Sequence, residues 1–233
     1  MQITTQQMET FRRDGFMVIP QLIDAAAVAL LREHYDRFLR REIDASTDKQ
    51  LGGKIRQILM PSQFDPIFLD NPALTAARDL AGQLLHQPSP PFVFDMLISK
   101  EPGNTSPTPW HQDFAYHNQP FVKAGTPITN TSLQFWVALD DVDLENGCMH
   151  FIPGQHEGPV KPHYVASGDP ANERRLLATD AVDATKAVAC PLQAGGCTIH
   201  MEGTPHYTPG NTSKNRSRRA YIFNYGKHLI PKV

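Results

Sequence analysis

The chain has 233 residues, which is enough to bury a sizeable hydrophobic core and lies near the upper end of what one β-barrel or sandwich domain uses. Its 22 Lys and Arg residues against 24 Asp and Glu leave a net charge of -2, which excludes the strongly basic surface that binding to nucleic acid or anionic lipid requires. We therefore expect one domain over residues 1–233, with a small and fairly neutral molecule as its partner.

Neither a membrane segment nor a disulfide framework is expected. Residues 1–15 are polar, and no apolar run approaches the roughly 18 residues that span a bilayer. The cysteines, Cys148, Cys190 and Cys197, are odd in number and lack C-x-x-C spacing, which also argues against a thiolate zinc site. We expect core thiols and a cytoplasmic protein, either a monomer or a homodimer.

Helices are predicted in the first 90 residues. A short polar helix over 4–11 stops before Gly15, and a strand over 16–20 ends at a proline. Asp24 is a suitable N-cap for an amphipathic helix that continues to Arg41. A second amphipathic helix is predicted from Asn71 as cap and Pro72 as first residue, with a strand over 52–60 between the two.

After residue 91 the sequence changes to short apolar runs separated by Pro, Gly and Asn, which is typical of all-β structure. Helices followed by strands favour a mainly β fold with N-terminal helices, in which a helical cover (1–90) packs on a double-stranded β-helix, a cupin-like jelly roll (91–233). The mouth of such a barrel is a common binding site. The predicted strands are 92–100, 133–139, 149–152, 197–200 and 219–225.

A histidine and a carboxylate stand two residues apart in Trp110-His111-Gln112-Asp113. In an extended backbone His111 and Asp113 face the same way. Imidazole and carboxylate are ligands that Fe(II) accepts, and a second histidine from far along the chain would complete a 2-His-1-carboxylate facial triad.

His206 is the best candidate for that second histidine. It closes Gly203-Thr204-Pro205-His206 after an apolar strand and precedes the basic run 216–219. An arginine there can form a bidentate pair with the far carboxylate of a dicarboxylic co-substrate. His200 is the rival ligand, although it lies before this segment. We expect structural roles for His34, His86, His156, His163 and His228.

Five segments of the chain together carry a resemblance to a known family. They are Phe11 to Pro20; Met96-Leu97-Ile98-Ser99-Lys100; His111-Gln112-Asp113 with Tyr116; Trp136 to Asp140 with Glu145-Asn146-Gly147-Cys148 and Pro153-Gly154-Gln155-His156; and His206 with Asn211, Ser213 and Arg218-Arg219-Ala220. In this order they resemble the phytanoyl-CoA dioxygenase family of Fe(II)/2-oxoglutarate oxygenases. A lone His-x-Asp motif is weak evidence, whereas the order of all five makes the assignment strong.

The resemblance implies that His111, Asp113 and His206 bind Fe(II) and that Arg218 pairs with the C5 carboxylate of 2-oxoglutarate, with O2 as the oxidant. Arg219 is the competitor; successive strand residues face opposite sides, and the Arg-Arg-Ala register favours Arg218. The resemblance also suggests four further residues near the co-substrate, namely Gln134, Trp136, Met96 and Lys54.

The implied reaction is oxidation of a substrate C–H bond, most simply hydroxylation, with 2-oxoglutarate converted to succinate and CO2. Desaturation, epoxidation or cyclisation remains open, as do a cupin-like isomerase and a non-catalytic sensor. Because the Asp113 carboxylate occupies the place where halide-transferring relatives have a small residue, halogenation is not expected. Residues 114–130 and 50–65 are candidate lids. Only Lys161 and the pair Arg174-Arg175 suggest a groove for CoA phosphates, so we expect a small metabolite instead.

Overall fold

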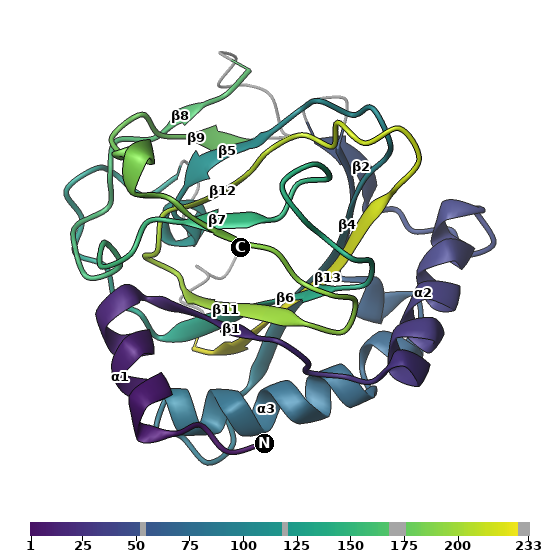
Figure 1. The fold of residues 1–233 in the computed structure, drawn as a ribbon, viewed down its shortest axis with the longest axis horizontal. Helices are drawn as coiled ribbons and strands as arrows, with labels where there is room; N and C mark the ends of the chain where they lie inside the picture. Colours follow the sequence, from purple (N-terminus) through teal and green to yellow (C-terminus); the bar gives the residue numbers. More distant parts are fainter. Residues whose placement is uncertain (52–54, 118–120, 168–175, 228–233) are drawn as a thin grey trace.

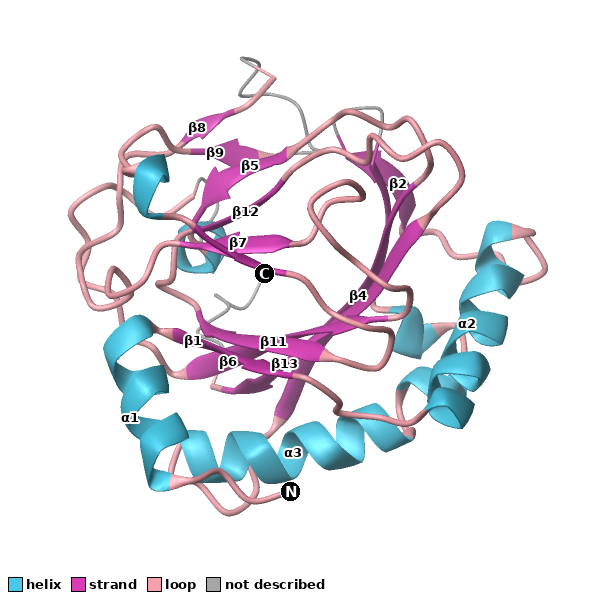
Figure 2. Ribbon diagram, in the orientation of Figure 1, coloured by secondary structure: helices cyan, strands magenta, loops and turns pink. Residues whose placement is uncertain are grey.

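The computed structural model describes residues 1–51, 55–117, 121–167 and 176–227. Two antiparallel sheets face each other, and the helices cover the outer side of the larger one (Figure 1). Figure 2 shows how strands dominate the later part of the chain. The predicted mainly β fold with N-terminal helices is confirmed.

Side-chain caps set where the three α-helices of the described residues begin. Thr4, Asp24 and Asn71 each accept hydrogen bonds from backbone N–H groups of the first turn. The helix capped by Asp24 ends at Leu39, two residues earlier than predicted, because Arg41 adopts a left-handed φ of 60°. The helices are α1 (Thr5–Asp14), α2 (Ala25–Leu39) and α3 (Pro72–Leu84).

The large sheet has seven strands and the small sheet four. In spatial order, the large sheet contains β1 (Phe16–Ile19), β11 (Cys197–Met201), β6 (Ser132–Ala138), β13 (Arg218–Gly226), β4 (Phe92–Lys100), β3 (Ile55–Leu59) and β2 (Asp48–Leu51). The small sheet contains β10 (Val188–Cys190), β7 (Met149–Phe151), β12 (His206–Thr208) and β5 (Thr108–His111). A separate pair joins β8 (Tyr164–Val165) to β9 (Leu177–Ala178).

The predicted strands agree with β4, β6, β7, β11 and β13 to within a residue, whereas β2, β5, β10 and β12 were not predicted as strands. The candidate lid over 50–65 is largely wrong, because β3 pairs with β4 as part of the large sheet and a 3-10 helix, η1 (Pro61–Gln63), follows. Gly147, which follows Asn146, has a positive φ of 96°, the backbone conformation that Asn-Gly turns favour.

The alternation of side chains along the large sheet creates two cores. Phe135 of β6 and Phe223 of β13 face the helices and stack on each other, within a core that includes Tyr35 and Leu80. The alternate residues, such as Trp136, face the small sheet. Alternate side chains of β4, β6 and β13 therefore project into the interior between the two sheets.

The cysteines and the helices bear on two further predictions from the sequence. All three cysteines are buried and free, as expected of core thiols. Among the described residues, no helix has the length and apolar character needed to cross a bilayer.

Asp95 of β4 is a fully buried carboxyl on the helical side of the sheet. It accepts hydrogen bonds from the N–H and hydroxyl of Ser62, at 3.2 and 2.8 Å. Burial raises the pKa of Asp95 to about 7, although both Ser62 bonds lower it. Because folding raises this pKa, protonated Asp95 makes a favourable contribution to the free energy of unfolding that is fully present below the unfolded-state pKa. That contribution is lost as the pH rises toward about 7.

Asp95→Asn should therefore become more stable than the unaltered protein as the pH rises from 4 to 7, by about 1.4 kcal/mol per pH unit, with no further gain above that. Asparagine can still accept from the Ser62 N–H and can donate to its hydroxyl. Urea unfolding at a series of pH values measures the difference, and Asp70→Asn, at an exposed site, is the control. A stability difference that does not change with pH would contradict the assignment.

Candidate metal centre

The two predicted metal-binding segments meet on neighbouring strands. His111 ends β5, His206 begins β12, and the two residues are direct partners in the β5–β12 ladder. Asp113 opens the 3-10 helix η3 (Asp113–His117), immediately after β5. One potential ligand atom from each of the three residues lies within 4.8 Å of the others. Residues 95 positions apart in the chain, 111 and 206, thus form one cluster.

The hydrogen bonds of the two histidines determine which ring nitrogen carries a proton. Nδ1 of His111 lies 2.8 Å from the carbonyl oxygen of Pro109, and Nδ1 of His206 lies 2.9 Å from that of Thr204. A carbonyl oxygen only accepts, so Nδ1 is the donor in both rings. In the neutral imidazole, Nε2 then presents a lone pair.

Both lone pairs are directed at the same oxygen. Nε2 of His111 and Nε2 of His206 each lie 3.6 Å from Oδ1 of Asp113. Burial lowers the pKa of His206 well below its usual value, which favours the neutral ring. Burial alone would raise the pKa of Asp113, but His206, His111 and His200 outweigh it and hold the pKa well below its usual range. Two lone pairs facing a carboxylate oxygen repel it and each other, and a cation bound among them removes that repulsion.

The other carboxylate oxygen of Asp113 is held from the large sheet. Gln134 donates from Nε2 to Oδ2 over 2.7 Å, and Nε2 of His200 lies 3.2 Å from the same oxygen. Gln134 and His200 are neighbours in the β6–β11 ladder. His200, the rival ligand, therefore contacts the far side of the carboxylate. Such outer contacts orient a ligand and tune its affinity for metal.

This donor set fits a divalent transition-metal ion. It supplies two neutral imidazole nitrogens and one carboxylate oxygen from one side, which is the 2-His-1-carboxylate arrangement of non-haem iron sites. The Nδ1 bonds to backbone carbonyls are the partners that metal-binding histidines usually have. The contacts around Asp113 therefore match the predicted chemistry of iron.

Arg218 lies in the barrel interior with unused hydrogen-bonding capacity. The side chain is 1% exposed, and its guanidinium carbon lies 5.4 Å from the Trp136 ring centroid. Nη2 reaches Thr208 Oγ1 at 3.4 Å, whereas Nε and Nη1 have no partner among the described residues. Burial lowers the pKa of Arg218 to about 10, so it stays charged at neutral pH. A buried cation with a free donor on each edge of its guanidinium fits a guest carboxylate.

Arg219 faces the opposite side of β13. It forms ion pairs with Asp140 and Asp36, at 2.8 and 2.6 Å. Only Arg218 thus enters the barrel, as alternation along the strand predicted.

The remaining predicted co-substrate residues have mixed outcomes. Trp136 and Gln134 share the interior face of β6, and Met96 faces the same interior from β4, where its sulfur accepts a hydrogen bond from Gln57. Lys54 lies outside the described residues, as do His228 and the pair 174–175. The positions of Gln134, Trp136 and Met96 thus agree with the face of the sheet on which they were expected.

Sequence reasoning missed Lys100, which is fully buried beside Arg218. Its Nζ lies 2.8 Å from the Thr208 hydroxyl oxygen and 2.7 Å from the Pro209 carbonyl oxygen. The sequence does contain a signal. Lys100 lies at the end of an apolar strand and at even spacing from Met96, so both side chains face the same side.

Gln112, between two of the predicted ligands, ties three loops together. Its side chain donates to Gly203 O and accepts from Lys161 N, each at 2.8 Å. Its backbone N–H donates to Nε2 of His163 at 3.1 Å. Burial lowers the pKa of His163 to about 4, so this ring remains a neutral acceptor. His163 therefore has the structural role that was expected, but it acts at the metal-binding segment.

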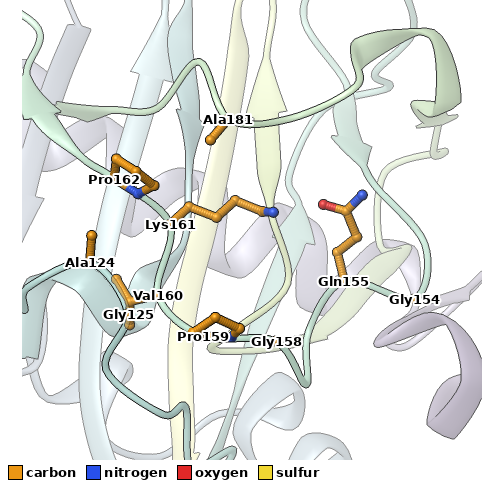
Figure 3. Close-up of a pocket in the computed structure, with 10 residues that line it drawn as sticks. All are labelled: Ala124, Gly125, Gly154, Gln155, Gly158, Pro159, Val160, Lys161, Pro162 and Ala181. Atoms are coloured by element: carbon orange, nitrogen blue, oxygen red, sulfur yellow. The ribbon is translucent and has the colours of Figure 1, made fainter.

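A cavity of about 650 Å³ adjoins this loop. Figure 3 shows the Lys161 side chain extended among the residues that line it, and Lys161 is the only charged one among the described residues of this lining. The predicted lid over 114–130 packs part of its length, including Phe114 and Val122, against Val160 in a small separate apolar cluster. Its residues 118–120 are not described.

Known proteins are similar to this chain in sequence and in fold. The family model described as phytanoyl-CoA dioxygenase (PhyH) matches residues 11–220. Peroxisomal phytanoyl-CoA dioxygenase of Bos taurus is 27% identical over 180 residues, which cover 69% of this chain and 50% of that protein. The chain thus corresponds to about half the length of that relative.

Solved structures agree over nearly the whole chain. EvdO2 from Micromonospora carbonacea var. aurantiaca, complexed with 2-oxoglutarate, is 35% identical with a TM-score of 0.82, covering 96% of this chain and 91% of the other. The epimerase SnoN, in complex with Fe3+, alpha ketoglutarate and nogalamycin RO, is 25% identical with a TM-score of 0.68, covering 95% and 82%. With a family match over most of its length and this agreement in fold, the chain belongs to the phytanoyl-CoA dioxygenase family.

Proposed function

We propose that this protein is an Fe(II)/2-oxoglutarate-dependent oxygenase that oxidises, most simply by hydroxylation, a C–H bond of a small molecule. The observation that carries the proposal is the convergence of two imidazole lone pairs on one oxygen of Asp113, in the same interior that holds the incompletely bonded guanidinium of Arg218. Family membership and the similarity to EvdO2, which was solved with 2-oxoglutarate, support it.

In this proposal His111, Asp113 and His206 hold the iron. When bound, Fe(II) with 2-oxoglutarate and O2 supplies oxidation of a C–H bond coupled to decarboxylation of the co-substrate to succinate. Gln134 and His200 keep Oδ2 of Asp113 occupied, so that Oδ1 remains turned toward the histidines.

Arg218 would bind the C5 carboxylate of 2-oxoglutarate. Its free Nε and Nη1 lie on the two different edges of the planar guanidinium, and each shares its edge with Nη2, so either free donor together with Nη2 matches the two oxygens of a carboxylate. Trp136 packs on the guanidinium and fixes its plane. The surrounding apolar residues of the inner core, including Met96 and Ile222, keep water away from the pair, which strengthens the attraction.

A small metabolite suits the site better than a CoA thioester. The phosphates of CoA call for several cations, and the part of the chain that the structure describes contributes one, Lys161, to the cavity beside the metal-binding segment. A cytoplasmic location and a monomeric or homodimeric state stay predictions, as does the organisation as one domain.

An epimerase outcome is the second candidate, because SnoN, a structural relative at 25% identity, is an epimerase in complex with Fe3+ and alpha ketoglutarate. It would use the same residues. A metal-dependent isomerase without 2-oxoglutarate, or a sensor, would leave the free donors of Arg218 unexplained.

Anaerobic titration of the purified protein with Fe(II) and 2-oxoglutarate tests the proposal. We expect the metal-to-ligand charge-transfer band of a chelated 2-oxo acid near roughly 500 nm. His206→Ala, which removes one nitrogen ligand, should lose both iron binding and the band. Iron bound without a band in the unaltered protein would remove the oxygenase assignment.

Arg218→Met should keep iron binding and weaken 2-oxoglutarate binding by about 100-fold, because a charge-assisted bidentate pair is lost while the packing on Trp136 is kept. The same spectral titration measures the affinity. Arg219→Met is the matched control: its side chain pairs with Asp140 outside the barrel, so 2-oxoglutarate affinity should not change. Equal effects of the two substitutions would contradict the role of Arg218.

A further inference from the structure

Two basic side chains lie side by side in the barrel interior without a carboxylate between them. Lys100 of β4 and Arg218 of β13 are partners in the ladder and are 0% and 1% exposed. Among the described residues, neither forms an ion pair with a carboxylate. A buried charge without a counter-ion is costly, so one member of such a pair gives up its proton when the barrel holds no anion.

Lys100 is the member that loses its proton. Burial lowers its pKa to about 5, and Arg218 adds to the effect. Arginine keeps its charge, as its pKa of about 10 requires. At neutral pH Lys100 is therefore an amine with two N–H donors and one lone pair.

Three oxygen atoms surround this amine. The carbonyl oxygens of Thr208 and Pro209 lie 3.3 and 2.7 Å from Nζ, and the Thr208 hydroxyl oxygen lies at 2.8 Å. The two carbonyls only accept, so they take the two N–H groups of the neutral amine. The lone pair then faces the Thr208 hydroxyl, which must donate its hydrogen to Lys100.

The same hydroxyl also contacts Arg218. Nη2 of Arg218 lies 3.4 Å from Thr208 Oγ1 and donates to it. With Lys100 neutral, the Thr208 hydrogen is therefore used on Nζ. With Lys100 protonated, the third N–H of the ammonium donates to Oγ1, and the hydroxyl hydrogen becomes available to a new acceptor.

We propose that binding of the distal carboxylate of 2-oxoglutarate beside Arg218 takes up one proton from solvent at Lys100, and that the Thr208 hydroxyl reverses its hydrogen bond in the same event. This inference rests on the proposed function. The new N–H bond forms at the Nζ lone pair. The co-substrate arrives with both of its negative charges, one of which offsets Arg218 and so makes a second positive charge favourable.

Other titratable groups around the pair do not supply this proton site. Tyr35 of α2 and Cys148 before β7 act on Arg218, and burial raises the pKa of each, that of Cys148 to about 11. Both are therefore already protonated at neutral pH. Asp140 also acts on Arg218, but Arg219 and Arg32 hold it on the outer side of the sheet. β3 contributes apolar Ile55 to the inner core.

Calorimetry measures the proton directly. The Fe(II)-loaded protein is titrated anaerobically with 2-oxoglutarate at pH 7, in buffers of different ionisation enthalpy at one ionic strength. The dependence of the observed heat on buffer should give an uptake of about one proton per 2-oxoglutarate. The dissociation constant should rise about tenfold per pH unit between pH 6 and 8.

The matched ligand is 2-oxopentanoate, which has the same chain length and the same 2-oxo acid group but no distal carboxylate. It should bind more weakly and without proton uptake. Lys100→Met should bind 2-oxoglutarate without proton uptake and with a dissociation constant that does not vary with pH. If this variant does not fold, the comparison of the two ligands on the unaltered protein still decides.

Three results would overturn the inference while the proposed function stands. They are 2-oxoglutarate binding without proton uptake, equal uptake with both ligands, and undiminished uptake in Lys100→Met. Failure of 2-oxoglutarate to bind the iron-loaded protein at all would overturn the proposed function and this inference together.

Discussion

The two oxygens of the Asp113 carboxylate are held from opposite sides, and the rest of the site follows from that division. Gln134 and His200 hold Oδ2 from the large sheet, while His111 and His206 of the small sheet face Oδ1. The cluster therefore exists only when the two sheets are packed face to face. Because burial strengthens electrostatic interactions, the arrangement concentrates negative potential at one point in the barrel. The three residues that would bind a metal ion at that point lie on β5, η3 and β12, and the large sheet acts on the ion only by orienting the Asp113 carboxylate.

Much of the fold and part of the site could be predicted, because the rules involved are local. Caps at Asp24 and Asn71 gave the helix starts, and the alternation of side chains along a strand separated Arg218 from Arg219. The same alternation placed Trp136 and Gln134 on the inner face. The three residues predicted to bind iron come together in the structure.

What was missed depends on contacts between distant parts of the chain. β5 (Thr-Pro-Trp-His) and β12 (His-Tyr-Thr) are short and lack an apolar alternation, so their pairing with each other and that of β12 with β7 define them. Lys100 reads as the solvated end of a strand, and its burial results from β12 lying across the barrel. The contact between His163 and Gln112 joins loops 51 residues apart, which no periodicity reveals.

The place of β13 in the large sheet has a consequence for how the protein is made. Last of the described strands in the sequence, it lies between β4 and β6, which are synthesised long before it. Until it emerges from the ribosome, both neighbours have an unpaired inner edge, and such edges favour aggregation. Pairing of β13 with both neighbours completes the large sheet and places Arg218 in the barrel interior in one step. A nascent chain therefore acquires its complete large sheet and its buried guanidinium together, after the other described strands have been made.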